Sequence, residues 1–283
     1  MSHGRLPPAE RSNRVGSNPF RRELIPVAAE ALELGTASSV VGRPTHMLAT
    51  VETKPGPIRW GLPDFGWAWV AIIFGQVVLG AIVFAARGLK LNHRTDAIDI
   101  AVITAGTAAL TLVILGLISS WKGQRSLFAD FGLRIRIRDW PWLLAGVGLQ
   151  LLATGAVQII NAVGGTQPEQ DVARALQHSN SVGRLLGAVA VVVGAPLAEE
   201  LLFRGLLLRG LLRRMRAAPA ALLCGGLFAA AHLLDPNAAV FFAPLMLVGV
   251  LASMRAIRTG ELSQSLLLHA GFNLLSAIFL LQG

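Results

Sequence analysis

Cysteine, tyrosine and charge are all scarce in this chain. Its 283 residues include one cysteine, Cys224, and no tyrosine, and only 14% of them are charged. A single cysteine excludes a disulfide framework and also a zinc site held by several thiolates. Few charges combined with 53% hydrophobic residues are typical of a polytopic membrane protein. The composition therefore predicts an all-α polytopic membrane protein, a bundle of about seven (roughly six to eight) transmembrane helices with a site inside the bundle.

The net charge of +9 suggests nucleic acid at first, but the basic residues flank apolar runs instead of gathering in a polar domain. Lys and Arg are enriched in the cytoplasmic loops of membrane proteins, and here they favour the N-terminal segment and one set of alternate loops. We therefore expect the lipid bilayer as a partner, no nucleic acid, and an N-terminus in the cytoplasm. The high content of Ala, Gly and Arg and the lack of tyrosine indicate a bacterium, and hence the bacterial cytoplasmic membrane.

Three regions follow from the pattern of apolar runs. Residues 1–62 are rich in Pro, Ser, Arg and Glu and lack a long apolar run, so they predict a disordered cytoplasmic tail. Residues 63–165 predict the N-terminal transmembrane helices, and residues 185–282 predict a transmembrane core that carries the polar motifs. The individual spans are expected at about 66–86, 100–120, 140–163, 185–212, 218–234, 238–254 and 262–282.

The segment 195–205 places two adjacent acids and an arginine inside an otherwise apolar span. Charges at bilayer depth cost roughly 2.5–3.5 kcal/mol each on insertion scales and are usually functional. Residues four apart share a helical face, so Glu200 and Arg204 are expected to pair. Glu199 is turned by about 100° from Glu200 and is left free for chemistry. Pro196 removes a backbone donor just upstream and is expected to free polar backbone groups near the acids.

Two histidines and an asparagine lie in the later spans. His232 ends the run 228–232, while His269 and Asn273 are four residues apart and share a helical face. A lone buried histidine is most often a hydrogen-bonded structural residue, and a lone asparagine often joins two helices. Counted from the nearest basic boundaries, however, Glu199, His232 and His269 lie level within about one helical turn. This convergence predicts one shared site in the cytoplasmic half of the bilayer.

These groups can hydrolyse an amide bond. A partly desolvated glutamate is suited to activate water, histidine can orient water or protonate a leaving amine, and Asn273 can donate to an oxyanion. Glu199, His232 and His269 can also hold a divalent metal such as zinc with one position open. Serine catalysis is not expected, because no serine lies on the right face of the last helix.

Together these residues resemble the three motifs of the CPBP family of intramembrane proteases, which includes the CAAX proteases and the bacteriocin-processing or Abi proteins. The pattern EExxxR, FxxxH and HxxxN occurs in that order on three separate helices, over about residues 185–281. The residues that the resemblance marks as catalytic are Glu199, Glu200, Arg204, His232, His269 and Asn273.

The resemblance implies cleavage of peptide bonds in the membrane by water activated on Glu199. Glu200 and Arg204 would support that base, the two histidines would assist, and Asn273 would stabilise the oxyanion. The substrate would be a membrane protein or peptide, and for the type II CAAX relatives it is a prenylated C-terminal peptide. Family members are described both as metal-dependent and as metal-free glutamate proteases, so the zinc ion stays open.

Two other classes of function compete with the protease. A catalytically silent immunity or regulatory partner could use the same fold, but a binding role does not need Glu199 unpaired. A proton-coupled transporter also uses intramembrane Glu and His, yet the sequence shows no pair of broken helices in an inverted repeat. Intramembrane endopeptidase is therefore the preferred prediction.

Overall fold

The computed structural model describes residues 58–88, 96–164, 179–234 and 236–282, and within these ranges every regular element is a helix. Most of the predicted tail, residues 1–62, lies outside the described ranges. Its last residues lie inside them: Trp60 is only 2% exposed, and its indole nitrogen donates to Oδ1 of Asp130 at 3.0 Å. The packed part of the chain thus begins before residue 63, where the sequence predicted it. The composition of the tail does not indicate this, because the partner of Trp60 lies 70 positions away.

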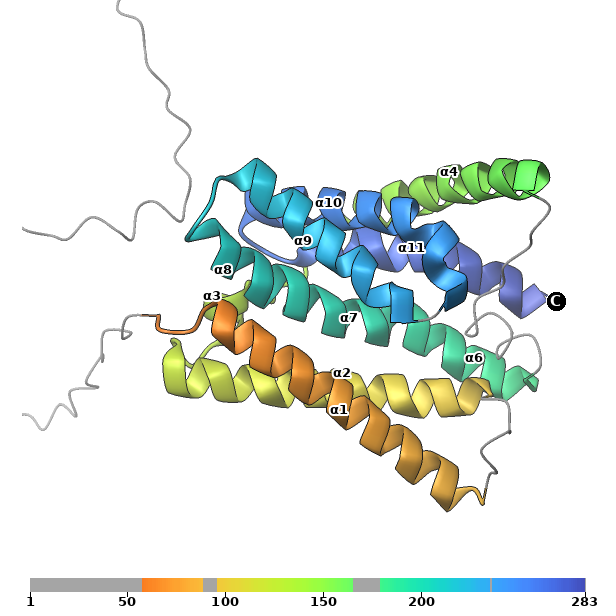
Figure 1. The fold of residues 1–283 in the computed structure, drawn as a ribbon, viewed down its shortest axis with the longest axis horizontal. Coiled ribbons are helices and arrows are strands. Elements are labelled where there is room, and N and C mark those ends of the chain that lie inside the picture. The colour runs from red at the N-terminus through yellow and green to blue at the C-terminus, as the bar shows by residue number, and fades with distance from the viewer. Residues whose placement is uncertain (1–57, 89–95, 165–178, 235, 283) are drawn as a thin grey trace, which may run out of the picture. The chain divides into compact units, whose positions relative to one another are not determined.

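Most of the described bundle consists of long helices (Figure 1). The long helices that lie outside the acidic span are α1 (Leu62–Ala86), α2 (Ala97–Lys122), α4 (Pro141–Gly164), α9 (Ala217–Ala231), α10 (Phe242–Thr259) and α11 (Ser263–Gln282). The short elements outside that span are α3 (Leu127–Phe131) and three 3₁₀ turns, η2 (Ile137–Asp139), η5 (His232–Leu234) and η6 (Pro236–Phe241). Each predicted span falls on one of these helices or on the acidic span.

The acidic span crosses the middle of the bundle as one helical rod made of five segments (Figure 1). In order they are α6 (Ser181–Val189), η3 (Ala190–Gly194), α7 (Ala195–Glu200), η4 (Leu201–Leu207) and α8 (Leu208–Leu212). Segments η3 and η4 are π-helical, so the short segment α7 lies between two wide turns. Such wide turns inside helices frequently occur at functional sites.

Six helical stretches of the described chain are long and apolar enough to cross a membrane. They are Leu62–Ala86, Ala97–Lys122, Ile137–Ile159, Ser181–Leu212, Ala217–Leu234 and Ala239–Thr259, and α11 is a further long helix beside them. Many large apolar side chains on their outer faces are exposed, as a bilayer requires. These features confirm the predicted all-α polytopic membrane bundle.

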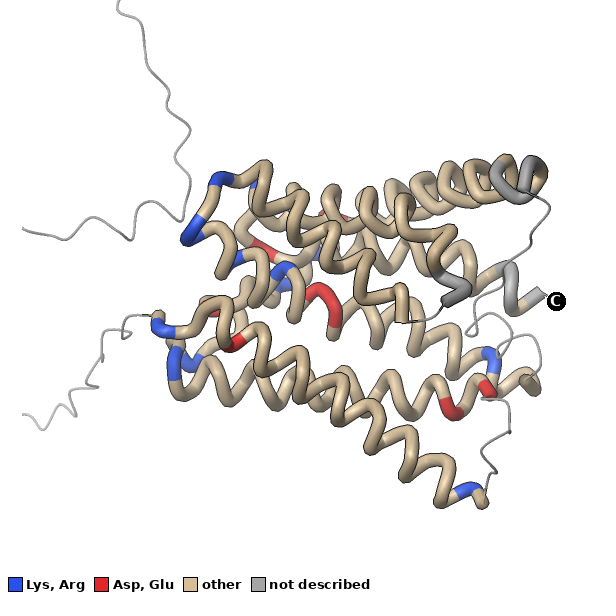
Figure 2. The backbone as a smooth tube through the Cα atoms, viewed as in Figure 1, with Lys and Arg blue, Asp and Glu red and all other residues tan. Residues whose placement is uncertain are grey.

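Most charged residues of the described chain lie toward the two ends of the bundle, and few lie in its middle (Figure 2). One end, where α2, α8 and α10 finish and α4 begins, carries most of the described Lys and Arg. The opposite end has Arg87 paired with Asp96 at 2.9 Å and with the buried Asp99. The hydrogen bond from Arg87 holds the pKa of Asp96 below its usual range. The red segment in the middle of Figure 2 is an exception, and it consists of Glu199 and Glu200 in α7.

Glycines allow the helices around α7 to cross at close range. A Cβ atom on Gly225 of α9 would lie 2.7 Å from the backbone nitrogen of Val250 in α10. A Cβ atom on Gly146 of α4 would lie 2.0 Å from the carbonyl oxygen of Leu268 in α11. Small residues permit such backbone contact in membrane helix pairs, and here they bring α9 against α10 and α4 against α11.

Helix α10 continues past the predicted end of its span, near residue 254, to Thr259. Gly260 then stops it in the left-handed conformation, with φ of 72°, which glycine adopts without strain. The sequence placed a loop at 255–261 because Arg255 and Arg258 interrupt the apolar run. Both arginines instead extend the helix beyond its apolar part.

Candidate active site

Glu200 and Arg204 form the predicted pair inside the bundle. Their atoms Oε1 and Nη1 lie 2.7 Å apart, and both side chains are fully buried. A second nitrogen of Arg204, Nη2, donates to the carbonyl oxygen of Gly249 at 3.1 Å. The guanidinium also lies 4.5 Å from the ring centre of Phe228. Ion pair, hydrogen bond and aromatic ring together satisfy a charge that would otherwise be very costly at this depth.

His269 lies between the two glutamates. Its Nδ1 atom is 3.1 Å from Oε1 of Glu200, and only 3% of the residue is exposed. An ionised carboxylate can only accept, so Nδ1 carries the hydrogen in this contact. The other ring nitrogen, Nε2, lies 3.7 Å from Oε2 of Glu199. That gap exceeds a direct hydrogen bond and suits a shared water.

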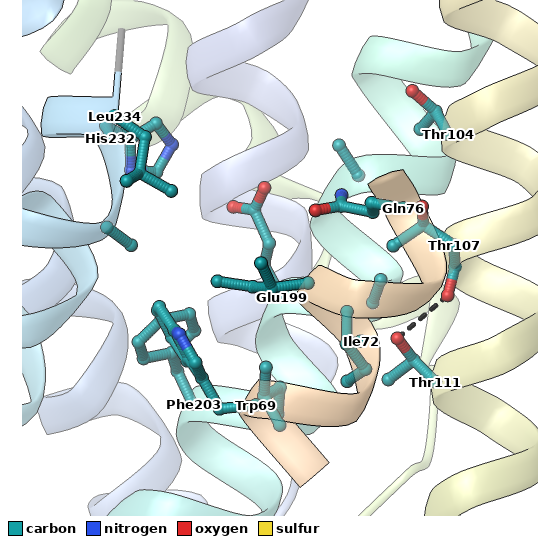
Figure 3. A pocket seen from close by; sticks show the side chains of 15 residues that line it. Trp69, Ile72, Gln76, Thr104, Thr107, Thr111, Glu199, Phe203, His232 and Leu234 are labelled. Carbon is teal, nitrogen blue, oxygen red and sulfur yellow. Dashed lines mark hydrogen bonds between the residues drawn. The ribbon is translucent and has the colours of Figure 1, made fainter. Parts of the chain in front are cut away.

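Glu199 differs from Glu200 in having an open side. Its side chain is 29% exposed and lines a cavity of about 270 Å³, while its Oε2 atom is buried with no hydrogen-bond partner within the described residues. The cavity lies between α1, α2, α7 and the end of α9 (Figure 3). Polar and aromatic side chains that line it include Trp69, Gln76, Thr104, Thr107, Thr111, Phe203 and His232. One carboxylate is thus neutralised locally while its neighbour faces a cavity, as the helical offset predicted.

His232 lines the same cavity from the end of α9, across from Glu199 (Figure 3). Its Nδ1 atom lies 2.9 Å from the carbonyl oxygen of Phe228. A carbonyl accepts, so Nδ1 carries the hydrogen here, and Nε2 is the nitrogen left for water or a ligand. The ring also packs against Phe228 at 4.9 Å between centroids. The structure therefore brings His232 and His269 to the acidic segment from two different helices, as predicted.

Asn273 is engaged away from the cavity. Its Nδ2 atom donates to the carbonyl oxygen of Val191 at 2.9 Å. The preceding bond of this wide turn runs from the nitrogen of Ala195 to the oxygen of Ala190, five residues back. In the same register Val191 would accept from residue 196, but that residue is Pro196 and has no N–H. The proline therefore frees this carbonyl, and the asparagine of α11 satisfies it.

Gln76 is the polar cavity residue that the sequence analysis missed. It lies in α1, a helix of high mean hydropathy, and its amide points toward the carboxylate of Glu199 (Figure 3). No hydrogen bond joins Gln76 to another described residue, whereas Thr107 and Thr111 bond to carbonyls of their own helix. The sequence signal that could have indicated Gln76 is a single amide side chain within a long apolar run, because polar residues inside membrane spans are usually functional.

The residues proposed for zinc do not form a complete ligand set. Within the described ranges, no three His, Cys, Asp or Glu side chains are placed to hold one metal ion. His269 uses Nδ1 on Glu200 and leaves only Nε2 beside Glu199. His232 faces the cavity without joining that pair. Zinc on these three residues stays a prediction, and metal analysis of the purified protein tests it.

A helical bundle of membrane-spanning length, with a buried acid, arginine and histidine cluster beside a cavity, defines an integral membrane protein with a polar site inside its spans. Residues 181–275 match the family model described as type II CAAX prenyl endopeptidase Rce1-like. The match begins with α6 and contains every motif residue, so it confirms the resemblance indicated by the three motifs. Helices α1, α2 and α4 lie outside it. Comparison with curated proteins gave no match, and neither did comparison with solved structures.

Proposed function

We propose that this protein is an intramembrane endopeptidase that hydrolyses peptide bonds of membrane-associated substrates, with Glu199 activating the attacking water. The observation that carries the proposal is that the two adjacent acids have different surroundings. Glu200 is buried and neutralised by Arg204, whereas Glu199 opens onto a cavity with a histidine nitrogen 3.7 Å away. The matched family is one of endopeptidases, and prenylated CAAX-type peptides are the substrate class that its description suggests.

Glu199 acts as the general base in this mechanism. A water in the cavity gives a proton to the carboxylate of Glu199 while its oxygen attacks the carbonyl carbon of the scissile peptide bond. The carbonyl electrons move to oxygen and form an oxyanion. When the intermediate collapses, the C–N bond breaks, and the leaving nitrogen takes the proton back from Glu199 or from a neighbouring histidine. The products are one carboxylate and one amine.

Glu200 and Arg204 are positioning residues for this step. Because Nδ1 of His269 donates to Glu200, its ring is held with Nε2 directed at Glu199. Arg204 holds Glu200 in place from one helical turn away. A carboxylate that orients a histidine in this way fixes both the ring and its tautomer. The buried pair thus sets where the proton sits beside the catalytic carboxylate.

The oxyanion needs a donor that faces the cavity. Asn273 was predicted for this role, but its amide donates to Val191. Gln76 reaches toward Glu199 from the opposite wall with its amide oxygen foremost (Figure 3), and rotation of the amide about its last side-chain bond turns the NH2 group, the donor, into the cavity. A substrate carbonyl lying between the two would have the base on one side and a hydrogen-bond donor on the other, as acyl transfer requires. We therefore assign the donation to Gln76.

Replacing Gln76 by alanine should lower kcat about 10- to 100-fold with little change in KM, because a donor used mainly in the transition state affects the chemical step. Peptide cleavage in detergent micelles measures both constants. Gln158→Ala removes the same amide from the exposed face of α4, outside the cavity, and should be neutral. A Gln76→Ala enzyme with wild-type kcat would remove this residue from the reaction.

Replacing Asn273 by alanine should reduce the free energy of unfolding by about 1–3 kcal/mol, because the carbonyl of Val191 loses its donor. Thermal unfolding in detergent measures the change. Cleavage should fall less than for a variant of Glu199. A variant with unchanged stability and abolished cleavage would instead place the amide at the oxyanion.

The orientation of the protein is part of the proposal. The strongly basic end of the bundle lies in the cytoplasm by the distribution of Lys and Arg, and this places the N-terminus there too. A bacterial cytoplasmic membrane fits the composition. The cavity has α1 as one wall, and α1 contacts mainly α2 and η4. Substrate therefore has access from the bilayer beside α1, most of whose surface is left uncovered by the described helices.

The alternative is a catalytically silent partner of the same fold. Incubating the purified protein with a library of prenylated and unprenylated membrane peptides, followed by mass spectrometry, separates the two. We expect fragments from the wild type and none from Glu199→Ala. Tight binding of peptides without any fragment would favour the silent partner.

A further inference from the structure

A second cavity, of about 620 Å³, lies outside the catalytic site, between α4, α10 and α11. Along α4 its wall includes Ala145, Leu149 and Leu152, which are spaced by three or four positions and so share one helical face. Along α10 it includes Leu251 and Met254, followed by two arginines in the same register. We call this feature the α4–α10 groove. Its volume is in the range of about 300–1,000 Å³ typical of small-molecule sites.

The groove is apolar along its length and closed at the bottom. Leu268 of α11, which is 2% exposed, forms part of its floor. Ala145, Leu152 and Met254 are exposed on its walls, so the described protein leaves this surface for another apolar group to cover. In a bilayer the group available at this position is an acyl chain.

One end of the groove is cationic. Arg255 and Arg258 line it there, one turn apart on α10, at the bundle end rich in Lys and Arg (Figure 2). Arg255 is held in place: its Nε and Nη2 atoms donate to Oε1 of Gln264, and its guanidinium lies 4.1 Å from the ring centre of Trp142. Trp142 is also part of the groove, at the first turn of α4. A tryptophan beside arginines at a span end is typical of the interface region.

Two acids lie near this end, and each has a partner other than the two arginines of the groove. Asp139 accepts from Gln264 at 3.0 Å, and Glu261 is bound by Arg134 and Arg136. Arg258 makes no ion pair or hydrogen bond with any described side chain, and Arg255 keeps Nη1 without one. Two positive charges, of which Arg255 is held in place, lie at the mouth of an apolar groove and are complementary to one kind of membrane component.

We propose that the α4–α10 groove binds an anionic phospholipid, with the acyl chain along Leu149, Leu251 and Leu268 and the phosphate headgroup at Arg255 and Arg258. Basic pockets between membrane helices bind acidic headgroups by the same charge complementarity. The site is separate from the cavity of Glu199, and the proposal does not depend on the proposed peptidase activity.

Lipid binding to the purified protein in neutral detergent tests the proposal. Phosphatidylglycerol should raise the midpoint of thermal unfolding, and phosphatidylcholine with the same acyl chains should do so clearly less. Arg258→Gln should weaken the apparent affinity for phosphatidylglycerol about fivefold, since an arginine near an anionic lipid contributes about 1 kcal/mol. Ala145→Trp, which fills the groove from its exposed wall, should weaken binding of that lipid further.

Arg214→Gln is the matched control, because Arg214 is exposed at the same end of the bundle and outside the groove. It should leave the affinity unchanged. Equal stabilisation by both lipids would overturn the headgroup assignment. Equal effects of Arg214→Gln and Arg258→Gln would show that only the overall charge matters, and unaltered binding by Ala145→Trp would exclude the groove.

Discussion

Glu199→Gln should give a folded protein that cleaves peptides at least about 100-fold more slowly than the wild type. Removing a general base typically lowers a rate by about 10²–10⁴-fold. Glutamine keeps the shape of the side chain but cannot take a proton from water. It also removes a charge from a cavity wall where Oε2 has no hydrogen-bond partner, so stability should be unchanged or higher. Cleavage rate and thermal unfolding in detergent are measured on the same preparation.

His232→Ala and His269→Ala provide the comparison for this result. Both should also reduce cleavage strongly, but His269→Ala should lower stability as well, because Glu200 loses its Nδ1 donor. His232 is held by a backbone carbonyl near the surface of the cavity, so its loss should affect the rate more than the fold. Wild-type cleavage by Glu199→Gln would make the assignment of this site to peptide hydrolysis wrong.

Arg204→Ala should destabilise the protein by about 3–5 kcal/mol, the usual effect of removing one member of a buried ion pair. Glu200 would then remain ionised and buried with His269 as its remaining partner, and the carbonyl of Gly249 would lose a donor. The loss should be visible as a large fall in the midpoint of thermal unfolding. Cleavage should fall too, because His269 is then no longer held against Glu199.

The double variant Glu200→Gln with Arg204→Gln identifies the cause. It removes both charges while keeping polar side chains of similar length, so it should be more stable than Arg204→Ala. Arg214→Ala serves as a control for the loss of an arginine, because Arg214 is exposed just beyond the end of the same span and outside the site. A stable and fully active Arg204→Ala protein would show that the pair is accessible to water.

The parts of the site that follow from local periodicity could be predicted from the sequence. The pairing of Glu200 with Arg204 needs only the four-residue spacing of a helix, and the structure has it at 2.7 Å. That His269 lies level with Glu199 followed from comparing depths in the membrane, whereas its contact with Glu200 is seen only in the structure. The seven spans followed from apolar length, and each coincides with helix in the described ranges.

The remaining features depend on contacts between distant residues. The bond from Asn273 to Val191 joins positions 82 apart and exists because Pro196 frees one carbonyl, so no local pattern indicates it. Gln76 looks like an isolated polar residue until α1 is placed beside α7. The predicted start of the packed chain, residue 63, lies a few residues too far along the sequence. The reason is that Trp60 is anchored by Asp130, which follows two membrane spans later.

The two wide turns that flank α7 have a rotational consequence. Each π-helical stretch holds more residues per turn than an α-helix, so the direction of α7 is offset from that of both α6 and α8. In a regular helix each residue is rotated by about 100° from the one before it, so the direction of every side chain along the rod would be fixed relative to all the others. Here the wide turns rotate the acids about the helix axis relative to α6 and α8. The outer segments can therefore keep the faces that suit the lipid and their neighbours, while α7 independently aims one carboxylate at the arginine and the other at the cavity.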